Sequence, residues 1–491
     1  MLDRLLATST LWNEVMASIP RPLSGRRTER EALDRVLASD RAELVALYGR
    51  RRVGKTFLVR RYFQDQAVVY FEMVGRCDAN TQQQLTIFAE ALSVTFYPRA
   101  ALASPESWHD AFRALVAAIE QGRARKRKYV LFFDEVPWID THRSGFLREL
   151  EHFWNSWCSR RDDIVVIVCG SAASWMLSKV INARGGLHNR LTRTIRLLPF
   201  SLAETSEFFE HKKIKLTRRE LCELYMVFGG VPHYLESVAR GRSVAQVVDE
   251  VCFSKDGVLN GEFDRLFASL FGDDPKYVAV VRALAKRRRG LTRDELLDAI
   301  GVSTGGGASK IITNLEEGGF ITSSVPFGRT ERDRFLRLTD EFSLFHLKWM
   351  DSRRVRRWRD VHGTPAWQVW SGLSFESVCL RHVHRIERAL GISGVRSEVS
   401  AWLHKDAQID LLIDRADGVI TVCEIKFTDQ PFEIQKRYAE ELRQKLDCFR
   451  RVTKTRKSVR LVFVTPYGLV ANRHSTDLVD SEIRMDAFFE H

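Results

Sequence analysis

An eight-residue segment in the first part of the chain leaves it few folds to adopt. The segment reads Gly49-Arg50-Arg51-Arg52-Val53-Gly54-Lys55-Thr56, fits the spacing G-x-x-x-x-G-K-[ST], and follows the apolar run 43–48. Glycines at both ends let backbone N–H groups surround phosphate oxygens, and the helix predicted next turns its positive end toward the anion. We expect Lys55 to contact the β- and γ-phosphates of a nucleotide and Thr56 to bind Mg²⁺. The segment therefore predicts a phosphate-binding loop between a buried strand and a helix.

A pair of acidic residues follows a second apolar run. Residues 129–133 read as a buried strand, and Asp134 and Glu135 come directly after it. We expect Asp134 to complete the Mg²⁺ shell and Glu135 to polarise the water that attacks the γ-phosphate. The alternative is a helix N-cap or a solvated strand end, which the upstream loop disfavours. ATP and Mg²⁺ are therefore the predicted cofactors.

Polar residues near two further predicted strands are weaker candidates for the same site. Ser171 follows the strand predicted over 164–169, where its hydroxyl would sense the γ-phosphate or only cap the strand end. Arg190 and Arg193 precede another predicted strand, and a guanidinium there could reach a phosphate in cis or the nucleotide of a neighbouring subunit. In a chain this basic, a solvated surface role fits either arginine equally well. A contact in trans would make the protein a homo-oligomer.

The secondary-structure pattern divides the chain into four predicted domains. Over residues 1–200, apolar runs alternate with helical stretches, which is typical of a parallel sheet covered on both faces. Residues 201–274 read as a helical lid, and residues 275–350 as three helices and a strand pair, the order of a winged helix-turn-helix. Residues 351–491 return to an α/β pattern, so the fold class is multidomain α/β. The eight cysteines form no C-x-x-C pair, and we expect neither a zinc site nor disulfides.

The last predicted domain carries two acids and a lysine on neighbouring strands. Asp410 and Glu424 are equally far from Asp417, so a hairpin centred there would place them opposite one another. Lys426 would share the face of Glu424, because strand side chains alternate. Carboxylates about 5 Å apart could share one Mg²⁺ ion, with Lys426 activating the attacking water. The alternative is a cross-strand salt bridge on a solvated face.

The chain from about residue 22 to residue 236 resembles the AAA-related and STAND-like P-loop ATPases of prokaryotes. It is similar to the archaeal-type ATPase family that carries a winged helix and a nuclease-like C-terminal domain. The matching segments are PLSGRRTERE at 22–31, the loop GRRRVGKT, the strands VLFFDE and IVVIVCGS, and GGVP at 229–232. The resemblance implies that residues 22–31 lie near the adenine. It also implies that residues 229–232 begin a lid helix that faces the nucleotide.

The C-terminal spacing D-x(13)-E-x-K looks like the PD-(D/E)xK site of the restriction-endonuclease-like fold. Ile409 stands where the motif has proline, and residues 431–438 also resemble the matching segment of the ATPase family. The resemblance adds Glu376, in a predicted helix, as a metal ligand beside Asp410 and Glu424. It implies a Mg²⁺-dependent DNA-cleaving domain in which Lys426 is catalytic.

The net charge of +13 favours a polyanionic partner, and we expect DNA. Arginine and lysine cluster at 123–128, 286–289 and 353–359, the last around Trp358, as a DNA-facing connector or as solvated surface. The predicted recognition helix, 308–317, has one lysine and two glutamates, so we expect a protein partner there instead. No apolar run is long enough to span a bilayer, and residues 1–15 do not fit a signal peptide. We therefore expect a cytoplasmic protein without a membrane contact.

These features lead to one principal function and two alternatives. The principal hypothesis is a P-loop ATPase that binds and hydrolyses ATP and thereby controls a Mg²⁺-dependent DNA nuclease. The first alternative is a STAND-like ATP switch or scaffold whose C-terminal domain binds DNA or protein without cleaving it. The second is a transcription regulator built on the winged helix, which the acidic recognition helix disfavours.

Overall fold

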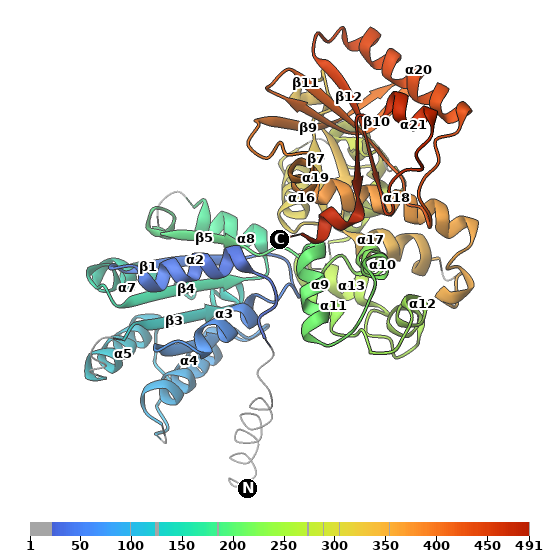
Figure 1. Ribbon diagram of the computed structural model, residues 1–491. Helices are drawn as coiled ribbons and strands as arrows, with labels where there is room; N and C mark the ends of the chain where they lie inside the picture. Colours follow the sequence, from blue (N-terminus) through green and yellow to red (C-terminus); the bar gives the residue numbers. More distant parts are fainter. Residues whose placement is uncertain are drawn as a thin grey trace.

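The computed structural model describes residues 22–490 except 99, 123–126, 184–185, 273, 288, 304 and 353. The segment 1–15, tested above as a signal peptide, and one part of each basic cluster (123–126, 288 and 353) lie outside these residues. Figure 1 shows an N-terminal α/β unit and, beside it, a second body that contains the remaining elements. Within the described residues, no helix has the length and apolar character needed to cross a membrane.

A five-stranded parallel sheet forms the N-terminal unit, in the order β2-β3-β4-β1-β5. The strands predicted over 43–48, 129–133 and 164–169 are present as β1 (Glu43–Tyr48), β3 (Tyr129–Asp134) and β4 (Ile164–Gly170), and β2 (Val69–Val74) and β5 (Arg193–Arg196) complete the sheet. Helices α2 (Arg27–Ala38) and α3 (Lys55–Gln64) pack on one face, and α4 (Thr81–Phe96), α5 (Trp108–Gln121) and α7 (Phe146–Ser156) on the other. Because both faces are covered, β1, β3 and β4 are buried along their whole length, as their continuous apolar runs predict.

Short helices dominate the chain after residue 201, as predicted. They are α9 (Leu202–His211), α10 (Arg218–Phe228), α11 (Pro232–Leu235), α12 (Val244–Val248) and α13 (Glu262–Phe271). The next segment contains α14 (Pro275–Ala285), α15 (Arg293–Ile300) and α16 (Gly306–Glu317), with β6 (Leu291–Thr292), β7 (Ile321–Ser324) and β8 (Phe335–Leu338) in an antiparallel sheet of order β6-β8-β7. The predicted three helices and strand pair are present, and β6 is an additional strand. Helix α17 (Glu341–Phe345) follows.

A second five-stranded sheet, of order β13-β12-β11-β10-β9, forms the C-terminal region. Its strands are β9 (Ser397–His404), β10 (Ala407–Arg415), β11 (Val419–Ile425), β12 (Ser458–Thr465) and β13 (Ser481–Arg484). The first three are antiparallel neighbours, whereas β11, β12 and β13 run parallel. Helices α18 (Pro365–Arg381) and α19 (Val383–Ala389) pack on one face, and α20 (Lys436–Thr453) on the other, with α21 (Arg473–Leu478) beside α20.

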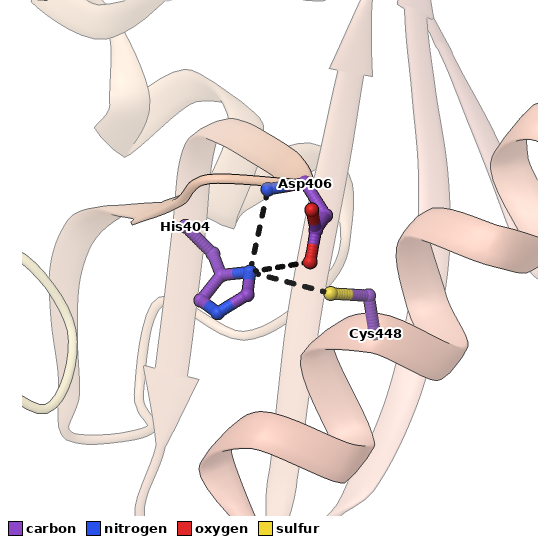
Figure 2. Close-up of side chains that lie close together, drawn as sticks. All are labelled: His404, Asp406 and Cys448. Carbon is purple, nitrogen blue, oxygen red and sulfur yellow. Dashed lines mark hydrogen bonds and ion pairs between the residues drawn. The ribbon is translucent and has the colours of Figure 1, made fainter.

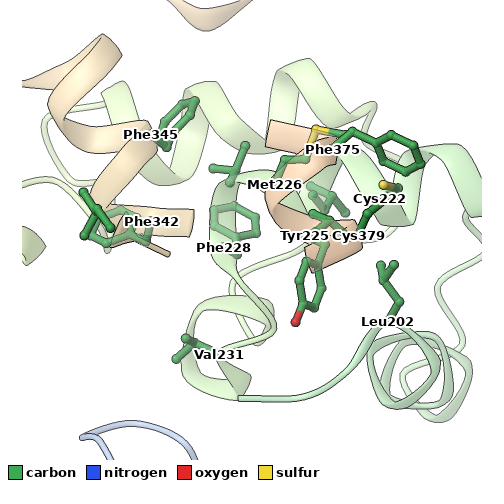
Figure 3. Packing of buried hydrophobic residues seen from close by; sticks show 14 of the residues in the cluster. Leu202, Cys222, Tyr225, Met226, Phe228, Val231, Phe342, Phe345, Phe375 and Cys379 are labelled. Atoms are coloured by element: carbon green, nitrogen blue, oxygen red, sulfur yellow. The ribbon is translucent and has the colours of Figure 1, made fainter. Parts of the chain in front are cut away.

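One hydrophobic core runs through most of the chain that follows the N-terminal unit, and a smaller one lies between the C-terminal sheet and α20. A single cluster of buried side chains runs from Phe200 to Phe488, through the short helices, the three-stranded sheet and one face of the C-terminal sheet. Figure 3 shows its centre, where Tyr225 and Phe228 of α10 lie near Phe342, Phe345 and Cys379. The three predicted domains after residue 200 therefore share apolar packing, and their boundaries stay a prediction.

The tryptophan of the basic connector lies inside this core. Trp358 is 1% exposed, and its ring centroid is 4.9 Å from that of Phe345 and 5.6 Å from that of Trp370. Beside it, the Arg359 Nε donates to the Asp249 carboxylate at 2.6 Å. Burial of the indole excludes a contact of Trp358 with DNA and leaves only the neighbouring cations at the surface. The two interpretations of the basic cluster, DNA-facing connector and solvated surface, both stay open.

Replacing Trp358 with alanine should destabilise this core. We expect Trp358→Ala to lower the free energy of unfolding by about 3–5 kcal/mol, the usual effect of removing a buried aromatic side chain. Urea unfolding followed by far-ultraviolet circular dichroism measures it. Val369→Ala, at a position 66% exposed on α18, serves as the control and should change stability little. Equal effects of the two substitutions would contradict this account of the core.

Candidate nucleotide-binding site

The predicted phosphate-binding loop connects β1 to α3. Gly49 has a φ of 152°, and a Cβ there would lie 2.2 Å from the Leu197 carbonyl oxygen, so a side chain has no room. Gly54 has a φ of 89° and immediately precedes Lys55, the first residue of α3. Both glycines are therefore required by the backbone, one for close approach and one for a left-handed turn. The loop brings the amino terminus of α3 to the carboxyl end of β1, as the sequence predicts.

Lys55 lies inside the loop. Its Nζ donates hydrogen bonds to the carbonyl oxygens of Gly49 at 2.9 Å and Arg50 at 3.0 Å, and the residue is only 5% exposed. The loop thus surrounds the Lys55 ammonium group. We expect the phosphates of a nucleotide to bind next to it. Anionic phosphate oxygens are stronger acceptors than neutral carbonyls, so a bound nucleotide can take over these hydrogen bonds.

The two predicted Mg²⁺ ligands contact each other. Thr56 Oγ1 donates to Asp134 Oδ2 at 2.5 Å, joining the start of α3 to the end of β3, and Asp134 is 1% exposed. A hydroxyl and a carboxylate at one point are oxygen donors of the kind that Mg²⁺ prefers. The donor set therefore fits a Mg²⁺ ion bound together with ATP.

Glu135 and Ser171 also meet at this edge of the sheet. The Ser171 backbone N–H and hydroxyl both donate to Glu135 Oε2, at 3.1 and 2.8 Å. Glu135 has a left-handed φ of 51° at the end of β3, and its N–H donates to Asp134 Oδ1 at 3.0 Å. Ser171 thus holds the carboxylate that we expect to act on the attacking water. Its predicted role as a γ-phosphate sensor stays a prediction.

Arg190 lies away from the loop. Strand β5 runs parallel to β1, with Arg193 beside Val45 and Arg196 beside Tyr48. The phosphate loop follows Tyr48, whereas Arg190 precedes Arg193, so Arg190 lies at the opposite edge of the sheet, exposed to solvent. The cis role of Arg190 is therefore wrong, because parallel strands separate their two ends. A role in trans stays a prediction.

Sequence reasoning missed how Arg26 acts on the loop. This buried guanidinium donates to the Val53 carbonyl at 2.9 Å and the Leu198 carbonyl at 2.7 Å, and it lies 4.5 Å from the Phe200 ring centroid. Arg26 belongs to the segment 22–31 that the resemblance places near the adenine. The segment does lie beside the nucleotide loop, where Arg26 fixes the backbone two residues before Lys55.

Acids from downstream elements hold two arginines of the loop. Arg50 forms an ion pair with Asp340, the N-cap of α17, and their side chains are 2% and 1% exposed. Arg52 forms an ion pair with Glu262, at the start of α13, whose side chain is fully buried. Burial by itself would raise the pKa of Asp340, but Arg50 and hydrogen bonds from Ser343 outweigh it and hold that pKa below its ordinary value. The arginines predicted to contact nucleotide therefore bind protein carboxylates here.

The C-terminal hairpin has the predicted turn but not the predicted carboxylate pair. Pairing runs from Leu411 beside Cys423 to Asp414 beside Ile420, which centres the hairpin on Asp417 as expected. However, the register between β9 and β10 shifts between residues 409 and 412. Residues 409 and 412 both pack on the α20 side of the sheet, so the alternation of side chains is interrupted at residues 410 and 411.

Asp410 and Glu424 have different neighbours as a result. The Asp410 carboxylate accepts a hydrogen bond from the Gln408 side chain and lines a cleft of about 1000 Å³ with Arg337 of β8. Glu376 also acts on Arg337: burial holds the pKa of Arg337 below its ordinary value, against the opposing effects of Asp410 and Glu376. Arg337 is therefore close enough to both acids for their charges to act on it. The expectation that Asp410, Glu376 and Glu424 bind one metal ion is not met in this arrangement.

Glu424 faces α20 and is fully occupied there. It accepts hydrogen bonds from the Tyr438 hydroxyl at 2.6 Å and the Lys445 Nζ at 2.8 Å, and the Lys426 Nζ lies 3.0 Å away. Burial would raise the pKa of Glu424, but Lys445 and Lys426 outweigh it and hold that pKa below its ordinary value. The predicted neighbours Glu424 and Lys426 do meet, and here Lys426 and Lys445 together offset the charge of Glu424.

The sheet order, the glycine-rich loop and the acidic pair at the end of β3 define a P-loop ATPase domain. Residues 23–238 match the family described as an ATPase domain predominantly from Archaea. This region is therefore an ATPase domain of archaeal type, as the resemblance implies, whereas the relation to AAA and STAND-like ATPases stays a prediction. Residues 348–442 match a second family, described as archaeal and bacterial proteins of unknown function.

One relative covers most of the chain, and a second covers a short part of it. A protein of uncharacterised function from Methanocaldococcus jannaschii is 22% identical over 428 residues, which cover 85% of this chain and 91% of that protein. An ATP-binding protein from the same organism is 42% identical over 43 residues, 9% of this chain and 73% of its own. The Walker-type ATPase of Pyrococcus abyssi superposes with a TM-score of 0.50 at 19% identity, covering 66% of this chain and 96% of its own, a likeness of fold alone.

Removing the Glu135 carboxylate should separate ATP hydrolysis from ATP binding. We expect Glu135→Gln to lower the hydrolysis rate about 10²–10⁴-fold, the usual contribution of a general base, and to keep ATP binding. Phosphate release and calorimetric titration with Mg²⁺ and ATP measure the two quantities. Glu90→Gln, at an exposed position of α4, is the matched control. A Glu135→Gln variant that hydrolyses ATP like the control would remove Glu135 from the site.

Proposed function

We propose that this protein is an ATP-hydrolysing switch, in which nucleotide binding to the phosphate loop controls how the ATPase domain docks on the region that follows it. ATP with Mg²⁺ is the ligand, Lys55 and Thr56 bind it, and Glu135 acts on the attacking water. The observation that carries the proposal is the pair of contacts from the loop arginines to Asp340 and Glu262. Because the same two loop arginines contact both the later region and the expected nucleotide site, docking and nucleotide binding become coupled.

Electrostatics sets the direction of that coupling. Breaking a buried ion pair by removing one partner is unfavourable by about 3–5 kcal/mol, so the docked arrangement is strongly held while both charges are present. Triphosphate brings further negative charge to the same loop, where it is attracted to Arg50 and Arg52 and repelled by Asp340 and Glu262. Nucleotide binding and docking therefore compete for the same arginines.

Neutralising Asp340 should strengthen nucleotide binding. Because coupling is reciprocal, weakening the docked state must favour the nucleotide-bound state by the same free energy, typically about 1–3 kcal/mol. We expect Asp340→Asn to raise ATP affinity about 5–150-fold, measured by titration of the full chain. Asparagine keeps an oxygen to accept the Ser343 N–H, which Asp340 accepts at 2.9 Å, and so preserves the cap of α17.

Asp351→Asn provides the control for this experiment. Asp351 pairs with Arg282 in the same region of the chain, at 2.7 Å for the longer of its two hydrogen bonds, but it does not contact the loop. Hydrogen exchange on the unaltered protein adds a second readout, since ATP should speed exchange near the start of α17. Unchanged affinity in Asp340→Asn together with unchanged exchange would overturn the switch.

The second candidate function is Mg²⁺-dependent cleavage of DNA by the C-terminal domain under control of the ATPase. It is favoured by the contact between Glu424 and Lys426, the Glu-x-Lys part of the predicted site. Asp410, which faces the cleft beside Arg337, would have to turn toward Glu424 for a metal ion to join the set. The net charge of +13 supports DNA as the partner of either function, and the winged helix-turn-helix over 275–350 is proposed as a protein-binding element.

A nuclease assay decides between the two functions. If the domain cleaves DNA, Lys426→Ala and Asp410→Ala should each lower Mg²⁺-dependent cleavage of a plasmid at least tenfold. Lys457→Ala, which removes a lysine paired with Asp414 on the same sheet, should not. Lys55→Ala then tests whether cleavage depends on nucleotide. Intact plasmid after long incubation, or equal cleavage by all variants, would reject the C-terminal site and leave the switch.

A further inference from the structure

Three side chains of the C-terminal domain converge at the end of the β9–β10 hairpin. His404 ends β9, Asp406 belongs to the turn, and Cys448 lies on α20 (Figure 2). We infer that His404, Asp406 and Cys448 form a binding site for a borderline-soft divalent cation, of which Zn²⁺ is the natural example. An imidazole, a carboxylate and a thiolate are the three protein donors that Zn²⁺ takes.

The spacing of the donor atoms suits a tetrahedral ion. His404 Nδ1 lies 3.5 Å from Asp406 Oδ2 and 3.7 Å from Cys448 Sγ. One ligand atom of each residue lies within 4.8 Å of the other two. Bonds of about 2.0–2.3 Å from zinc to nitrogen, oxygen and sulfur place neighbouring donors roughly 3.3–3.7 Å apart. The three atoms can therefore receive an ion with small side-chain movements.

The contacts distinguish a metal site from a catalytic triad. In a triad the acid and the nucleophile contact different ring nitrogens, because the imidazole passes a proton between them. Here the carboxylate and the thiol both approach the same nitrogen, His404 Nδ1, as Figure 2 shows. The Asp406 backbone N–H also lies 3.4 Å from Nδ1, a long contact that a cation bound to the nitrogen lone pair would replace. Donors that converge on one point are arranged for a cation at that point.

The surroundings orient these donors and leave one position open. The His404 ring stacks on Trp402, with centroids 5.8 Å apart and planes at 10°, which fixes its direction. Cys448 is buried, while the Asp406 side chain is 54% exposed, so water can complete the coordination from the solvent side. Arg451 is the competing cation, with its guanidinium 3.9 Å from Cys448 Sγ. An ion here would fasten the hairpin to α20, one turn from Lys445.

The expectation of no zinc site was based on the absence of a C-x-x-C pair. That test detects ligands that are close together in sequence, whereas these ligands come from a hairpin and from a helix that follows two strands later in the chain. The site is independent of the nucleotide loop, because it lies on the far side of the second sheet from α18.

Metal binding to the full chain tests the inference. After treatment with a chelator, the protein should bind one equivalent of Zn²⁺ in competition with a chromophoric chelator, without nucleotide present. Co²⁺ in its place should give a thiolate-to-cobalt charge-transfer band. We expect Cys448→Ser to abolish that band and His404→Gln to weaken Zn²⁺ binding at least tenfold. Cys77→Ser, which removes the exposed cysteine, is the matched control and should keep both.

Two further measurements distinguish loss of metal binding from misfolding of a variant. Zn²⁺ should raise the thermal midpoint of the control but not that of Asp406→Asn, a variant altered only at an exposed position. ATP binding should be equal in all variants, which shows that the ATPase domain is intact. Failure of the unaltered protein to bind Zn²⁺, or Co²⁺ binding without a thiolate band, would overturn the site.

Discussion

The buried ion pair between Arg50 and Asp340 is the contact on which the arrangement of the molecule depends. Arg50 belongs to the predicted phosphate-binding loop, and Asp340 caps the helix that follows the three-stranded sheet, so this contact, together with that of Arg52 and Glu262, joins the loop to the region that follows it. Charges this deeply buried are unfavourable unless they are paired. A new charge close to the Arg50–Asp340 pair would therefore change the stability of this contact. Burial also raises the pKa of the adjacent Glu341 to about 7, although Arg381 lies 2.9 Å away.

Much of the nucleotide site could be predicted from sequence because its parts are local. A strand, a glycine loop and a helix follow one another without a break, and parallel strands bring Asp134, Glu135 and Ser171 to the same edge. What the loop arginines contact could not be predicted. Arg50 and Asp340 are far apart in sequence, and an Arg-rich loop is read as phosphate-binding before its protein partners are known.

In the C-terminal domain, a different feature limited what could be predicted from the sequence. The hairpin, its centre and the neighbours Glu424 and Lys426 followed from strand alternation. The irregularity between Ile409 and Leu412 could not be predicted, because an inserted residue leaves no clear mark in a single sequence. Such a residue reverses the face of every side chain beyond it. The predicted cis role of Arg190 was wrong for a related reason. A residue that precedes a parallel strand lies at the end of the sheet opposite the phosphate loop, and composition does not reveal this.

The shared core after residue 200 has a consequence for how the protein forms during synthesis. Phe488 packs against His382, whose Nε2 accepts a hydrogen bond from the Leu202 N–H at 3.1 Å. The first helix of this region therefore finds part of its packing only when nearly all of the later chain has left the ribosome. The ATPase sheet, with cores of its own, can fold well before that moment. Nascent helices α9 and α10 would meanwhile expose apolar surface, which makes them natural substrates for chaperones.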